Sequence, residues 1–264
     1  MIETSVPNAS REVIIAGHSH IFAMGAPNSY KGERQLQPVP QFENMFFLME
    51  EWRGNRTPEY WAALAENARD RIIVISFNGN QHNASFLFRS GPAFDFWDAD
   101  DRGNLLPGAD VIPRLMVREF FKPSLAGLDS VVAEAMDGGA AKVIVLGTPP
   151  CKGDLDFIRK IVLGSEYFRR AAEKIGCDVE TVAITDTSVR VKLWGVLQEM
   201  MADIAEKRGA TFVPVPSAVL DGTRCLKSEF WANDVTHTNA AYGNLILKHL
   251  SLSLNLDEND GSSL

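Results

Sequence analysis

The order of short apolar runs along the chain restricts the fold more than any other feature of the sequence. Four such runs have the length of a buried strand: residues 12–17, 71–77, 141–150 and 210–216. Longer segments with apolar residues at helical spacing separate them. Strand followed by helix, repeated, predicts a parallel sheet covered on both faces. We therefore expect an α/β fold, a three-layer α/β/α sandwich with a central parallel sheet.

Four segments have the pattern of helices: residues 57–70, 112–139, 188–209 and 239–254. The first opens with Thr57 as N-cap and Pro58 in the first turn, and the third closes at Gly209. We expect the second helix to break before Pro123, because an interior proline removes a hydrogen bond and clashes with the preceding turn.

The length of 264 residues suits one α/β domain, which we place at residues 1–254. The remaining residues, 255–264, are polar and acidic, and we expect them to be disordered. Two stretches, 24–56 and 89–113, are rich in turn-forming residues. We expect both to lie beyond the sheet edge, where α/β enzymes place their binding loops.

Composition excludes several classes of partner. The net charge is −8, which argues against binding to nucleic acid or to an anionic membrane surface. The three cysteines include no CxxC pair, so neither a zinc knuckle nor a disulfide framework is indicated. The first residues lack the apolar stretch of a signal peptide, and no run approaches the roughly 20 apolar residues of a membrane span. We expect a cytoplasmic protein.

Reactive residue types follow the expected strands at their carboxyl ends, where open parallel sheets bind ligands. The first strand runs into the sequence GHSH at 17–20, and the second into the asparagine-rich segment 78–83. After the fourth strand, Asp234 and His237 lie three residues apart at the start of a helix. A nucleophilic serine needs a base, the base needs an orienting carboxylate, and an oxyanion needs neutral donors. All of these residue types are present.

These motifs make the chain resemble the SGNH (GDSL-type) hydrolase superfamily from about residue 12 to residue 250. Gly-His-Ser at 17–19 stands where the family has a G-D-S-like turn after the first strand. Asn80, in the sequence NGNQ, stands at the asparagine of the family's G-x-N-D turn. The segment 234–237 matches the family's D-x-x-H without change.

The resemblance implies an SGNH or flavodoxin-like sandwich that acts as an acyl or acetyl esterase. In that reading Ser19 is the nucleophile, His237 is the general base and then the acid, and Asp234 orients His237. The oxyanion hole would consist of the Ser19 backbone N–H, Asn80 and Gly54, our candidate for the family's second-block glycine. The resemblance implies no metal and no organic cofactor.

The sequence departs from the family pattern at three positions. His18 replaces the aspartate of the first block, which is not a triad member, so catalysis need not suffer. Asn78 replaces the glycine of the third block, and Gln81 replaces its aspartate. The substrate that the resemblance implies is a small acyl ester, such as an acetyl group on a carbohydrate.

Other readings of the same residues remain open at this stage. His18 and His20, with His82 and Asp234, offer the ligand types of a metal-dependent hydrolase. An O-acyltransferase of the same fold would pass the acyl group to a sugar hydroxyl instead of water. A non-catalytic carbohydrate-binding relative is a third possibility. In the esterase reading, His20 and His82 are candidate substrate-binding residues.

Overall fold

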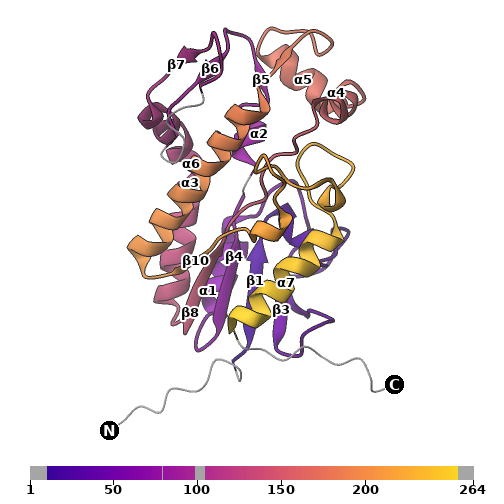
Figure 1. Ribbon diagram of the computed structural model, residues 1–264. Helices are drawn as coiled ribbons and strands as arrows, with labels where there is room; N and C mark the ends of the chain where they lie inside the picture. The colour runs from indigo at the N-terminus through magenta and orange to yellow at the C-terminus, as the bar shows by residue number, and fades with distance from the viewer. Residues whose placement is uncertain (1–10, 79, 99–104, 255–264) are drawn as a thin grey trace.

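The structure is a computed structural model that describes residues 11–78, 80–98 and 105–254. A six-stranded sheet lies between two layers of helices (Figure 1). The expected three-layer α/β/α sandwich is therefore confirmed. The segment 255–264, for which we expect disorder, lies outside the described residues.

The central sheet has the strand order β10-β8-β4-β1-β3-β2. Its strands are β1 (Val13–Gly17), β2 (Gln35–Pro38), β3 (Met45–Met49), β4 (Ile72–Ser76), β8 (Lys142–Leu146) and β10 (Thr211–Val213). All neighbouring strands pair in parallel except β2, which pairs with β3 in the antiparallel direction. The expectation of a parallel sheet thus holds for five strands and fails at one edge.

The sequence predicts that the whole segment 24–56 lies beyond the sheet edge as a loop, and this prediction is wrong. The segment supplies two strands of the sheet, and β3 pairs in parallel directly with β1. The run MFFLM of β3 is short and is surrounded by turn-forming residues, so the sequence pattern does not predict a strand there. Its side chains are nonetheless mostly buried, because packing within the sheet decides the conformation of such a short apolar run.

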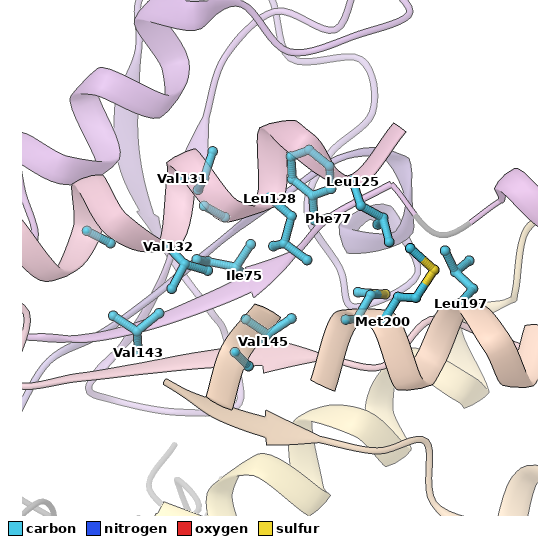
Figure 2. Close-up of a cluster of buried hydrophobic side chains, with 14 of the residues drawn as sticks. Ile75, Phe77, Leu125, Leu128, Val131, Val132, Val143, Val145, Leu197 and Met200 are labelled. Carbon is cyan, nitrogen blue, oxygen red and sulfur yellow. The ribbon is translucent and has the colours of Figure 1, made fainter. Parts of the chain in front are cut away.

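The two faces of the sheet carry different helices. Helices α1 (Pro58–Glu66), α3 (Arg114–Asp137) and α6 (Thr187–Arg208) cover one face, and α7 (Ala240–Leu254) covers the other. Alternate residues of one strand enter the two cores, as the strand period of two requires: Ile73 and Ile75 on one side, Ile72 and Val74 on the other. Figure 2 shows Ile75 among Leu128 and Val132 of α3. None of the described helices is both long and apolar enough to cross a membrane.

Helix α3 continues through Pro123, so the expected break before this residue is wrong. A proline costs a helix interior roughly 3 kcal/mol. Phe121 and Leu125, on either side of the proline, are almost completely buried against the core. Burial of one such side chain contributes about 1.5–3 kcal/mol, so packing offsets the local cost.

A group of small elements follows the carboxyl ends of β4 and β8 in the chain. They are α2 (Gln81–Ala84), β5 (Phe88–Arg89), β6 (Phe94–Asp95), β7 (Asp110–Val111), α4 (Leu155–Leu163), α5 (Glu166–Lys174) and β9 (Ala183–Ile184). Figure 1 shows β5, β6, β7, α4 and α5 together at one end of the molecule. The described part of 89–113 accordingly lies outside the main sheet, as expected, whereas α4 and α5 were not anticipated from the sequence.

Substitution of Gly243 tests how closely α7 packs against the backbone of Ala23. A Cβ atom at this position would lie 1.8 Å from the carbonyl oxygen of Ala23, which no adjustment of a flexible side chain can relieve. We predict that Gly243→Ala lowers the free energy of unfolding by at least ~2 kcal/mol, measured by urea denaturation. The matched control is Gly195→Ala in α6, where the nearest atom is the Arg224 side-chain nitrogen at 3.8 Å. That change should be neutral or stabilising by up to ~1 kcal/mol, and equal effects of the two substitutions would contradict the packing described.

Candidate active site

The turn that carries Ser19 is built tightly at the end of β1. A Cβ atom at Gly17 would lie 2.4 Å from the Ser76 carbonyl oxygen, so only glycine fits there. The Gly17 N–H donates to the Tyr60 hydroxyl at 3.0 Å, and its carbonyl accepts from Nε of Arg56 at 2.8 Å. The chain then enters a short 3-10 helix, η2 (Ser19–Phe22), with Ser19 as its first residue.

Ser19, His237 and Asp234 form one continuous chain of hydrogen bonds. His237 Nε2 lies 2.9 Å from Ser19 Oγ, and His237 Nδ1 lies 3.0 Å from Asp234 Oδ2. The other carboxylate oxygen of Asp234 accepts from the backbone N–H groups of Thr236 and His237, each at 2.6 Å. Of the two tautomers of the imidazole ring, this arrangement fits the one with its proton on Nδ1, which leaves Nε2 to accept the serine proton.

The carboxylate of Asp234 is held in its charged form. Burial alone would raise its pKa, but the hydrogen bonds from the His237 ring and from the backbone lower the pKa well below the usual range of an aspartate. A carboxylate that stays ionised can orient an imidazole and stabilise the imidazolium that forms during catalysis.

Lys152 holds the loop between Trp231 and His237 in place. Its ammonium group donates to the carbonyl oxygens of Ala232, at 2.7 Å, and of Asp234. Burial lowers the pKa of Lys152 to about 8, while the nearby Asp234 charge opposes that shift. Nothing in the sequence reading singled out Lys152, because its partners are backbone carbonyls that no motif records.

An open cleft of about 420 Å³ surrounds Ser19 and His237. Asn80, Gly54 and His20 line it as well, so it contains all but two of the predicted site residues. Asp234 lines an adjoining cavity of about 370 Å³, which shares Ser19, His20 and His237 with the cleft. The fully buried His82 lies on α2 and lines neither cavity.

Asn80 and Gly54 enter the cleft from two different loops. Asn80 follows β4 and is the N-cap residue of α2, and its Oδ1 is buried without a hydrogen-bond partner among the described residues. Gly54 has a φ of +90°, a conformation that favours glycine, between β3 and α1. Both therefore lie on the wall that also holds Ser19.

His18 lines the cleft as a neutral side chain. Its Nδ1 accepts the backbone N–H of Asn78 at 3.0 Å, and its ring contacts Trp61 and Phe77. Burial, and secondly the charge of Arg56, lower the pKa of His18 to about 4. This position, which holds aspartate in the family pattern, thus ties the nucleophile turn to the loop that follows β4.

The ligand set of a metal-dependent hydrolase does not assemble among the described residues. No group of three or more histidine, cysteine, aspartate or glutamate side chains lies close enough to hold one ion there. The Nδ1 atom of His18 already accepts a backbone N–H, and both oxygens of Asp234 are engaged by residues 236–237. The alternative built on His18, His20, His82 and Asp234 therefore has no geometric support.

Several solved structures are similar to this chain at low sequence identity. No protein-family model and no curated protein matches the chain. An acylhydrolase structure from Bacteroides fragilis, described as putative in its own name, is 13% identical with a TM-score of 0.48 and covers 96% of this chain and 92% of its own. A carbohydrate acetylesterase from Sinorhizobium meliloti is 13% identical with a TM-score of 0.44, covering 92% and 99%. A catalytic mutant of an acetylxylan esterase from Geobacillus stearothermophilus is 11% identical with a TM-score of 0.48, covering 96% and 97%. Similarity at this level does not establish a shared activity.

His20 provides a test of the electrostatics at this site. Burial, and then the neighbouring His237 and His18, lower the pKa of His20 to about 3. The unfolded chain binds a proton at this residue near pH 6.5, so the folded state loses stability as the pH falls below about 6.5. We predict that His20→Gln removes ~2 kcal/mol of the stability loss between pH 7 and pH 5, measured by denaturant unfolding at each pH.

The control for this experiment is His249→Gln, which changes a histidine of α7 that lines neither cavity. A pH dependence that is the same in His20→Gln and in the wild type would show that His20 is not buried in its neutral form.

Proposed function

We propose that this chain is a serine-dependent ester hydrolase of the SGNH type. The observation that carries the proposal is the hydrogen-bond chain from Ser19 through His237 to Asp234. A nucleophile, a base and an orienting carboxylate in this order are the parts that acyl transfer by serine requires. Their position at the open cleft beside the sheet's carboxyl edge supports a catalytic role over a structural one.

In the acylation step, Ser19 Oγ attacks the carbonyl carbon of the ester. His237 Nε2 takes the serine proton as the new C–O bond forms, and it then donates this proton to the leaving alcohol. Asp234 keeps the imidazole oriented and stabilises its positive charge. Water attacks the acyl-enzyme in the second half of the reaction, with His237 again as base, and this releases the carboxylic acid and restores Ser19.

The oxyanion of each tetrahedral intermediate would be bound by three neutral donors: the backbone N–H of Ser19, the side-chain amide of Asn80 and the backbone N–H of Gly54. The presence of all three residues on the wall of one cleft supports this assignment. In the Asn80 side chain only the amide nitrogen can donate a hydrogen bond, so it is the group that would contact an oxyanion. Loss of one such donor typically costs about 10²–10³ in kcat.

The cleft volume of about 420 Å³ is within the usual range of small-molecule sites, which supports a small ester as substrate. An acetyl group on a carbohydrate, which the family resemblance implies, remains a prediction. Acceptance of the acyl group by a hydroxyl in place of water would make the same site an acyltransferase, but no described feature favours it. The assembled serine, histidine and aspartate argue against a purely carbohydrate-binding role.

Substitution of the three residues tests the proposal directly. We predict that Ser19→Ala and His237→Ala each lower kcat on ethyl acetate by at least about a thousandfold. Asp234→Asn should retain more activity than His237→Ala, because the carboxylate orients the base without transferring the proton. Initial rates in a pH-stat measure all three variants against the wild type.

The matched control is Ser90→Ala, which removes the hydroxyl of an exposed serine that does not line the cleft and should leave the rate unchanged. Wild-type turnover by Ser19→Ala would contradict the serine mechanism. Full activity in His237→Ala with loss in Asp234→Asn would contradict the assigned roles of these two residues.

A further inference from the structure

A small side pocket of about 90 Å³ adjoins the cleft. The two hollows share four lining residues: Asn80, Ala84, Ser85 and Thr236. Asn80 is one of the candidate oxyanion donors, and Thr236 directly precedes His237 in the chain. A substrate bound at Ser19 could therefore extend one of its ends into the side pocket without leaving the molecule's surface.

The side pocket has an apolar wall supplied largely by α5. Its apolar and aromatic lining residues are Leu87, Phe88, Tyr167, Phe168, Ala171, Ile175 and Val235. The Phe88 and Phe168 rings meet edge to face, with their centres 5.9 Å apart. None of the described residues that line the pocket has a charged side chain. By contrast, the larger cavity near Asp221 and Lys227, which shares no lining residue with the cleft, has several charged residues on its wall.

The polar groups of the side pocket are few and partly unpaired. Asn83 lines it with only 4% of its surface exposed, and its Oδ1 has no hydrogen-bond partner among the described residues. The Oδ1 of Asn80 is likewise buried and has no hydrogen-bond partner among the described residues. Sites for small molecules typically combine an apolar wall with a few polar groups of this kind.

The volume limits what the pocket can hold. An apolar cavity of about 150 Å³ accepts benzene, a six-carbon molecule. In proportion, a pocket of about 90 Å³ has room for roughly four carbon atoms. A group of this size is larger than the methyl group of an acetyl ester and much smaller than a fatty acyl chain.

We propose that the side pocket binds a short apolar group of the ester, of about four carbon atoms. The proposal rests on the ester hydrolase function proposed above and adds its substrate class. The apolar group belongs either to the acyl part or to the alcohol part of the substrate, since both are attached to the carbonyl that Ser19 attacks. The chemistry of recognition is the same in both cases: burial of methylene groups against Phe88, Phe168 and Ala171.

Two series of esters with ethyl acetate in common distinguish these sources. The acyl series is ethyl acetate, ethyl butyrate and ethyl octanoate, and the alcohol series is ethyl, butyl and octyl acetate. In one of the two series, kcat/KM should rise about tenfold from two to four carbon atoms, because two further methylenes are buried. It should not rise further at eight carbon atoms, and the series that shows this maximum identifies the part that enters the pocket.

Two substitutions on α5 test whether the side pocket causes the preference. Ala171→Trp fills the pocket and should abolish the tenfold gain between two and four carbon atoms. Its matched control is Lys174→Trp, on the same helix but exposed and outside the pocket. If Ala171→Trp does not fold, Ile175→Ala serves instead: it removes a 40% exposed wall residue and should move the optimum to longer chains.

The outcomes separate the two proposals. Hydrolysis of ethyl acetate that depends on Ser19, without a four-carbon maximum or with the same maximum in Ala171→Trp, would overturn the pocket assignment and leave the esterase function standing. A steady rise to eight carbon atoms would overturn it too. A wild-type protein that hydrolyses none of the five esters would overturn the esterase function and the pocket assignment together.

Discussion

The hydrogen bond between Ser19 Oγ and His237 Nε2 is the contact on which the candidate site depends. It joins residues 218 positions apart, so neither loop can form the site alone. The serine turn is fixed by the fit of Gly17 against Ser76, and the histidine loop is fixed by α7, whose Gly243 packs directly on Ala23 just after the nucleophile turn. Correct packing of α7 on the sheet is therefore a condition for the candidate triad.

The sequence was informative where burial and local pattern agree. The strand at 72–76, rich in isoleucine and valine, and the Thr57 cap of α1 lie where the sequence predicts them. Prediction failed where tertiary packing overrides local preference: the run of β3 is short and surrounded by turn formers, and Pro123 lies inside a helix whose buried face compensates for it. These are contacts between segments far apart in the chain, which a pattern of neighbouring residues does not contain.

The same distinction applies to the site. Ser19, Asn80 and His237 could be chosen from the sequence because strand ends and motif spacing place them at one sheet edge, and they line one cleft in the structure. Arg56 and Lys152 could not, since they act on backbone carbonyls: Arg56 on that of Gly17, and Lys152 on those of Ala232 and Asp234. The buried position of these two cations follows from the carbonyl groups they satisfy, and those groups become neighbours only in the folded chain.

The central claim is that Ser19 is a nucleophile activated by His237, and covalent labelling tests it most directly. The protein would be treated with a fluorophosphonate, digested, and the modified peptide identified by mass spectrometry. Our account predicts a single adduct on Ser19, formed at a rate that falls sharply in His237→Ala. An adduct on another serine, or equally fast labelling of Ser19 without His237, would contradict it.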